Sequence, residues 1–472
     1  MPIDVILTAL VLVAGLYMAW NIGANDVSNA MGTSVGSGAL TLFKAVIIAG
    51  VLEFCGAFFL GGNVSKTMQS GIVNPDIFAH HPKTLLYGML AALTATALWL
   101  QVASYFGWPV STTHAIIGAL LGFGAMAGGI DAVRWSEVGR IAMSWVISPA
   151  LSGLFAFLIF STLQRKILFA MNPINATRRL IPITVFIVLF VFCLSILLNG
   201  LGSFQIEFSI TETLLIGCVV GFIGGLIAFF ALKKVYLPQP QSVSTNISQQ
   251  VFSLNKAVRH LKRVQLTTTG KQRERIGDLL KGVEEYATKV GEHSNLYTSG
   301  SDYKIVEKMF ASLQIMSAAY VAFAHGANDV ANAIGPVAAS LEIIRKGGFA
   351  AHSPVPPWLP AMGGMGIVLG LATWGWRVME TIGRKITELT PTRGFSAEFG
   401  AAITILIASK CGLPISTTHC IVGAVLGVGF ARGLSALNLR ILRDIALSWV
   451  ITIPSSAIVC ILLFYIIDAV FS

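Results

Sequence analysis

The chain contains 472 residues, of which 55% are hydrophobic and 11% are charged, and its formal net charge is +10. Because soluble domains carry about 25% charged residues, this composition excludes an ordinary soluble protein and predicts one embedded in a lipid bilayer. The basic residues lie mostly in short connectors and one middle stretch, which indicates membrane orientation and argues against nucleic acid as a partner.

Apolar segments near the length of about 20 residues that crosses a bilayer recur along the chain. In chain order they cover residues 5–20, 45–60, 85–106, 141–160, 181–198, 214–232, 309–324, 362–376, 399–407 and 445–471. Backbone groups in lipid must be hydrogen-bonded within their own segment, which favours helices. We therefore expect an all-α, multi-pass membrane protein with about 10–12 membrane segments, some of them irregular.

The distribution of basic residues predicts how the chain threads. No Lys or Arg precedes Lys44, whereas Lys233 begins a polar stretch rich in both. The positive-inside rule places the N-terminus outside and residues 233–304 in the cytoplasm. Within this stretch, apolar residues at 247–261 and 276–290 recur every three or four positions, which is typical of amphipathic helices. We expect a cytoplasmic helical loop; it serves either as a solvated connector or as a partner-binding element.

Two phrases occur twice in nearly identical form. The phrase "NIGANDVSNAMG" begins at Asn21 and "HGANDVANAIG" begins at His325, while "GWPVSTTHAIIGALLGFG" begins at Gly107 and "GLPISTTHCIVGAVLGVG" begins at Gly412. The spacing from the aspartate of the first phrase to the serine of the second is 85 residues in one half and 87 in the other. The chain is therefore an internal duplication.

The two copies are expected to cross the membrane in opposite senses, because one begins outside and the other begins after the cytoplasmic stretch. The predicted units are a first membrane repeat at 1–165, connecting transmembrane helices at 166–232, the cytoplasmic helical loop at 233–304 and a second membrane repeat at 305–472. Inverted-topology repeats place a shared site near the bilayer midplane, built from broken helices. This architecture predicts a transporter.

The first duplicated phrase carries Asp26 in one copy and Asp329 in the other. An ionisable residue inside a membrane is costly, so a functional role is the default hypothesis; capping of a local turn is the alternative. The glycines at 23, 32, 36 and 38 weaken the surrounding helix and predict a break there. We expect the two carboxylates to lie close together in one site.

The second duplicated phrase follows a Gly-x-Pro and predicts the tip of a re-entrant hairpin. Ser111 and Ser416 are suited to cap the helix that follows each proline. Helix N-termini bind oxyanions, and the hydroxyls of both copies add donors; they belong to Ser111, Thr112, Thr113, Ser416, Thr417 and Thr418. His114 and His419 follow these hydroxyls, either as further donors or as packed imidazoles.

No Lys or Arg lies beside the hydroxyls, so an anion near two aspartates would be repelled unless cations accompany it. Oxygen ligands suited to hard cations are present in both copies. They belong to Asn25, Asp26, Asn29, Asn328, Asp329 and Asn332. The pattern predicts bound cations beside an oxyanion, and the catalytic alternative, a hydrolase that uses Ser111, His114 and Asp26, leaves the duplication unexplained.

On these residues, above all "GANDVSNAMGTSVGSG", "GANDVANAIGP" and the two "STTH" tips, the chain resembles the inorganic phosphate transporter family over nearly its whole length. The resemblance implies inorganic phosphate as substrate, sodium or protons as coupling ion, and a homodimer. Matched residue by residue, phosphate contacts fall on Asn25, Asp26, Asn328, Asp329 and the six hydroxyls. Glu53 and Glu398 match acidic positions of the sodium-coupled branch.

We therefore expect a sodium symporter that imports phosphate across the plasma membrane by alternating access. Its ligands would be phosphate and sodium, with no further cofactor and no enzymatic activity. Two alternatives stay open at this point. One is a proton-coupled phosphate symporter, and the other is a membrane receptor that senses an anion without moving it.

Overall fold

A computed structural model gives the structure of the chain. It describes residues 3–108, 110–170, 172–199, 208–234, 254, 257–258, 261, 264–265, 271–294, 299–349, 355–375, 390–432 and 439–471. The described part is helical, with one isolated antiparallel bridge between Val73 and Val133. The expectation of an all-α fold is confirmed.

The first half of the chain supplies nine α-helices and three short helical turns. They are α1 (Ile3–Asn25), α2 (Val27–Gly36), α3 (Leu42–Leu60), α4 (Gly62–Ser70), η1 (Pro75–Phe78), α5 (Pro82–Phe106), α6 (Thr112–Gly128), η2 (Ile130–Ala132), α7 (Trp135–Leu163), η3 (Gln164–Leu168), α8 (Pro173–Asn199) and α9 (Ile210–Lys234).

The second half adds the remaining described elements. They are α11 (Lys271–Ser294), α12 (Ser299–Lys346), α13 (Trp358–Gly370), η5 (Leu371–Gly375), α15 (Pro391–Lys410), α16 (Thr417–Arg432) and α17 (Leu439–Phe471). The helix α11 confirms the helical expectation for residues 276–290, whereas most of residues 247–261 lies outside the described part of the chain.

Seven helical stretches among the described residues are long and apolar enough to cross a membrane. They are Ile3–Gly36, Leu42–Leu60, Pro82–Phe106, Trp135–Leu168, Pro173–Leu198, Ile210–Lys233 and Val450–Phe471. Two shorter apolar helices, Thr112–Gly128 and Thr417–Arg432, match the predicted re-entrant segments. The multi-pass character is thereby confirmed, while the count of about 10–12 segments stays a prediction.

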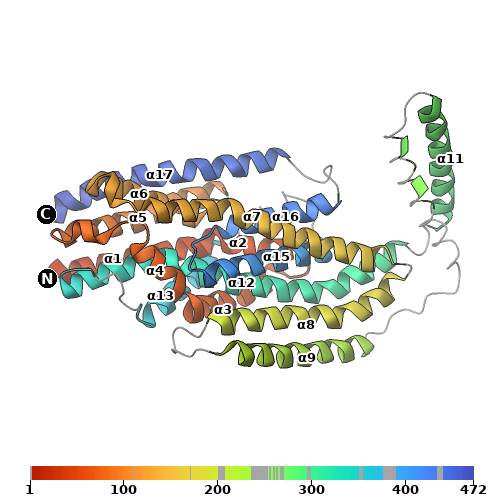
Figure 1. The fold of residues 1–472 in the computed structure, drawn as a ribbon, viewed down its shortest axis with the longest axis horizontal. Helices are drawn as coiled ribbons and strands as arrows, with labels where there is room; N and C mark the ends of the chain where they lie inside the picture. The colour runs from red at the N-terminus through yellow and green to blue at the C-terminus, as the bar shows by residue number, and fades with distance from the viewer. Residues whose placement is uncertain are drawn as a thin grey trace.

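The helices form an elongated bundle in which α1 and α12 run side by side in opposite directions (Figure 1). Both chain ends lie at one end of this bundle, and α11 stands apart at the other end (Figure 1). Large apolar side chains on α9, such as Leu215, Phe222 and Ile227, are exposed. In a membrane protein such side chains face lipid.

The predicted helix break is mild in the first copy and missing from the second. In the first, Asp26 alone separates α1 from α2, and its amide still donates to the Ile22 carbonyl at 2.9 Å. In the second, α12 continues through Asp329 without interruption. Fewer glycines follow Asp329 than follow Asp26, so the second copy lacks the residues that weaken the first.

Both copies of the second phrase form a turn followed by a helix with the predicted serine cap, while their re-entrant placement in the membrane stays a prediction. Helix α5 is followed by Gly107 (φ 67°), and α15 is followed by Gly412 (φ 65°). Left-handed backbone of this kind favours glycine, so each glycine lets the chain turn before the next helix begins. The hydroxyls of Ser111 and Ser416 then accept hydrogen bonds from backbone amides three residues on, at 3.2 Å in both copies.

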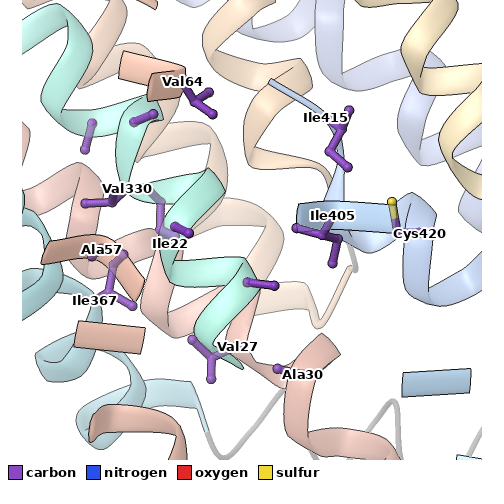
Figure 2. Close-up of a cluster of buried hydrophobic side chains, with 14 of the residues drawn as sticks. Ile22, Val27, Ala30, Ala57, Val64, Val330, Ile367, Ile405, Ile415 and Cys420 are labelled. Atoms are coloured by element: carbon purple, nitrogen blue, oxygen red, sulfur yellow. The ribbon is translucent and has the colours of Figure 1, made fainter. Parts of the chain in front are cut away.

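A buried apolar layer surrounds these motifs (Figure 2). It draws on α1 to α4, α12, α13, α15, α16 and the second hairpin tip, and Figure 2 labels Ile22, Val27, Ala30, Ala57, Val64, Val330, Ile367, Ile405, Ile415 and Cys420. The duplicated polar residues therefore lie inside the bundle, away from its lipid-facing surface.

Candidate functional site

The centre of the candidate site is the pair Asp26 and Asp329. Asp26 lies at the junction of α1 and α2, Asp329 lies in the middle of α12, and both are buried. One carboxylate oxygen of each, together with a ring nitrogen of His325, forms a group whose members lie within 4.8 Å of one another. Two aspartates that are 303 residues apart in sequence therefore meet at one point.

Each aspartate is held by the first threonine of its hairpin. The Thr112 hydroxyl donates to Asp26 Oδ2 at 2.7 Å, and the Thr417 hydroxyl donates to Asp329 Oδ2 at 2.8 Å. The duplication that is visible in the sequence is thus repeated in the contacts. One oxygen of each carboxylate is occupied, which leaves the other oxygen available.

The hairpin tips also contact each other. The Thr113 hydroxyl donates to the Ile415 carbonyl at 2.9 Å, and the Thr418 hydroxyl reaches the Val110 carbonyl at 3.5 Å. The Asn332 amide donates to the Thr113 hydroxyl at 3.2 Å. These bonds cross between the two halves of the chain, so the two starts of α6 and α16 lie together.

The asparagines before the two aspartates make equivalent contacts as well. Asn25 Nδ2 donates to the Ser104 hydroxyl at 2.9 Å, and Asn328 Nδ2 donates to the Ser409 hydroxyl at 3.1 Å. Sequence reasoning did not assign a role to Ser104 or Ser409. The duplication could have identified them, because both serines precede the hairpin glycine by three residues.

The buried oxygens of these residues lack hydrogen-bond donors within the described part of the chain. They are Asn21 Oδ1, Asn25 Oδ1, Asp26 Oδ1, Asn328 Oδ1, Asp329 Oδ1 and Asn332 Oδ1. A buried acceptor without a partner costs about 1–3 kcal/mol, so six of them in the two motifs call for a ligand. Since all six atoms are acceptors, the ligand that satisfies them is a cation or a donor.

Asn29 was also predicted as a cation ligand. Its backbone lies in α2, and its side chain lies outside the described part of the structure.

Glu53, on α3, joins this centre through His325. Both Glu53 carboxylate oxygens lie 2.8 Å from His325 Nδ1, and His325 Nε2 lies 2.7 Å from Asp329 Oδ2. A methyl group at Gly326 would clash with the Glu53 carbonyl, so this glycine lets α12 approach α3 closely enough for the contact. His325 had no predicted role, although it is an ionisable residue in a membrane segment.

Glu398, on α15, lies in a separate cluster of polar side chains. Its Oε1 accepts from the Thr33 and Ser34 hydroxyls at 2.5 and 2.7 Å and from Gln314 Nε2 at 3.2 Å. Its Oε2 accepts from the Ser317 hydroxyl at 2.5 Å. The carboxylate thus links α2, α12 and α15 and does not belong to the group formed by the two aspartates.

His114 and His419 meet behind the hairpin tips. Their ring centroids are 4.5 Å apart, and the His114 ring lies 3.9 Å from that of Trp145 on α7. His419 Nδ1 lies 3.5 Å from the Trp145 carbonyl. Both histidines are buried among aromatic rings, so they brace the starts of α6 and α16.

Comparisons with known proteins agree with this picture. A model described as the phosphate transporter family matches residues 22–460. A candidate phosphate permease of Chlamydia trachomatis is 45% identical over 99% of both chains. The chloroplastic inorganic phosphate transporter 2-1 of Arabidopsis thaliana is 43% identical, over 98% of this chain and 72% of the Arabidopsis protein. A solved structure described as "The sodium-dependent phosphate transporter" is 34% identical, with a TM-score of 0.80 over 98% of this chain and 99% of the other.

Proposed function

Because the chain belongs to the phosphate transporter family, we propose that it imports inorganic phosphate by sodium symport. Sodium enters from outside and binds beside Asp26 and Asp329, and phosphate then binds at the hairpin tips. The loaded site opens to the other side by alternating access. The similarity to a sodium-dependent phosphate transporter supports the choice of ion.

The observation that carries this proposal is the set of partnerless oxygens around the two aspartates. Carboxylate and amide oxygens are ligands that hard cations prefer. No Lys or Arg is buried among the described residues, so this part of the chain supplies no permanent cation to balance the carboxylates. Sodium ions would satisfy the oxygens and neutralise the charge in one step.

Phosphate binding is assigned to the starts of α6 and α16. The first amides of a helix have no partner in their own helix and lie at the positive end of its dipole, which suits an oxyanion. The hydroxyls of Thr113 and Thr418 lie at the two adjoining tips. In the described state these hydroxyls donate to backbone carbonyls, and rotation of the hydroxyl hydrogen would redirect each of them towards phosphate.

Alternating access is supported by the opposed directions of α1 and α12, which carry the two copies of the aspartate motif (Figure 1). A site built from two opposed halves presents similar surroundings to either side of the membrane. Each net positive charge carried inwards gains about 2.3 kcal/mol per 100 mV of membrane potential. An excess of sodium charge over phosphate charge would therefore drive accumulation.

The remaining assignments are a homodimer in the plasma membrane, with repeat boundaries at 1–165 and 305–472. They follow from the resemblance and from the duplicated motifs. Crosslinking of the purified protein in lipid would test the dimer, and a recovered species of monomer size alone would refute it.

The test of function is radiolabelled phosphate uptake by purified protein in liposomes. An inward sodium gradient is compared with an inward proton gradient in sodium-free potassium buffer. We expect uptake only with sodium. Uptake with the proton gradient alone would assign the protein to proton coupling, and phosphate binding without any flux would favour an anion-sensing receptor.

A further inference from the structure

His325 is an ionisable residue that the second half of the site has and the first half lacks. Alignment of Asp26 with Asp329 places Ile22 opposite His325, and both side chains are buried. The contacts of Thr112 and Thr417, and those of Asn25 and Asn328, occur in both halves, whereas the imidazole occurs only in the second. An ionisable residue at this position of one half gives that half a contact that Ile22 in the first half cannot make.

The contacts of His325 form a chain of three residues. Glu53 lies at 2.8 Å on one side of the ring, and Asp329 Oδ2 lies at 2.7 Å on the other. Asp329 Oδ2 also accepts the Thr417 hydroxyl, whereas Asp329 Oδ1 has no donor among the described residues. The ring nitrogen and the hydroxyl therefore both contact Oδ2 of Asp329, while Oδ1 has no donor among the described residues.

Glu53 contacts the ring nitrogen of His325 that does not face Asp329. Its two oxygens meet the same nitrogen of His325, and it does not belong to the group formed by Asp26, His325 and Asp329. The close approach of α3 and α12 at Gly326 fixes this order. The Glu53 carboxylate therefore contacts this group through the imidazole of His325.

We propose that His325 is a positioning residue of the sodium site, which connects Glu53 to Asp329 and orients the Asp329 carboxylate towards the cation. Glu53 accordingly acts through His325 and is not itself a sodium ligand. This inference rests on the proposed function and assigns the tasks within its cation site. Residues that support metal ligands typically change metal affinity by 10–100-fold when they are altered.

The test is a double-mutant cycle measured by sodium-driven phosphate uptake in liposomes. His325→Ile introduces the residue found at the equivalent position of the first half. Glu53→Gln removes the carboxylate charge from the Glu53–His325–Asp329 series of contacts. Each change is expected to raise the sodium concentration for half-maximal uptake by about tenfold or more. Because both changes interrupt the same series of contacts, the double variant should need no more sodium for half-maximal uptake than the more strongly affected single variant.

The Michaelis constant for phosphate at saturating sodium separates positioning from general damage. We expect it to stay within about twofold in all three variants, since the hairpin tips are unchanged. Ile22→Val is the matched control on the other half and should leave both constants as in the wild type. If His325→Ile does not yield a monodisperse protein, His325→Gln replaces it in the experiment. The glutamine amide still donates to one carboxylate, so we expect a smaller rise in the sodium concentration for half-maximal uptake.

Three results would overturn the inference. They are an unchanged sodium dependence in either single variant, parallel changes in the sodium and phosphate constants, or effects that multiply in the double variant. Failure of the proposed function is recognised separately, because the wild-type protein would then show no sodium-dependent uptake at all.

Discussion

The contacts between threonines and aspartates make a sharp prediction about the two hairpins. Thr112→Val and Thr417→Val each remove a hydroxyl that donates to a buried aspartate, at 2.7 and 2.8 Å respectively, while the side-chain shape is kept. Water has little access to these positions, since both threonines and both aspartates are buried. Thr112→Val therefore leaves Asp26 Oδ2 without its hydroxyl donor, whereas after Thr417→Val the Oδ2 of Asp329 keeps its 2.7 Å contact with His325 Nε2.

The expected magnitude follows from the charge of the acceptor. A hydrogen bond to a charged group contributes about 1.5–3 kcal/mol, and each 1.4 kcal/mol corresponds to about a tenfold change in affinity. We therefore expect the apparent affinity for sodium to fall by about tenfold to a hundredfold in each variant. Thr→Ser at the same positions keeps the hydroxyl and should restore most of it.

The assay is phosphate uptake in liposomes as a function of sodium concentration. Thr404→Val is the matched control, because Thr404 is a buried threonine of the second hairpin whose hydroxyl bonds the Gly400 carbonyl of its own helix, at 3.0 Å. It should change sodium affinity by less than about twofold. Sodium affinity that is unaffected in Thr112→Val and Thr417→Val, or reduced equally in Thr404→Val, would refute the reasoning.

Two further predictions concern stability. Gly326→Ala places a methyl group against the Glu53 carbonyl, and overpacking of this kind should lower the free energy of unfolding by about 1–3 kcal/mol. Gly139→Ala on α7 has open space around it and should not lower the free energy of unfolding. Thermal unfolding in detergent compares the two variants, and equal melting temperatures would contradict the close packing at Gly326. Sodium at a hundredfold excess over its dissociation constant should stabilise the protein by about 2.7 kcal/mol, and phosphate should stabilise it only when sodium is present; stabilisation by phosphate in potassium buffer would contradict this order of binding.

The local features of the chain were predictable because their causes are local. Apolar segments of membrane length and the serine caps at Ser111 and Ser416 each depend on a few consecutive residues. The internal duplication added long-range information, since two equivalent phrases in opposed repeats were expected to share one site. The meeting of Asp26 with Asp329 is confirmed.

The duplication misled the prediction where the two copies differ. Similar phrases favour similar backbones, yet α12 runs unbroken through Asp329 while Asp26 separates two helices. The neighbours of each phrase, above all the number of nearby glycines, decide whether the helix continues.

The membrane class, the duplicated motifs and the kinds of ligand that their oxygens and hydroxyls suit could all be predicted from the residues alone. The partner of each glutamate depends instead on the packing of the helices: Glu53 contacts His325, which contacts Asp329, whereas Glu398 accepts hydrogen bonds from Thr33, Ser34, Gln314 and Ser317. These partners lie on different helices, far apart in the chain. Their distances are set by how closely the helices pack, which no local pattern of residues records.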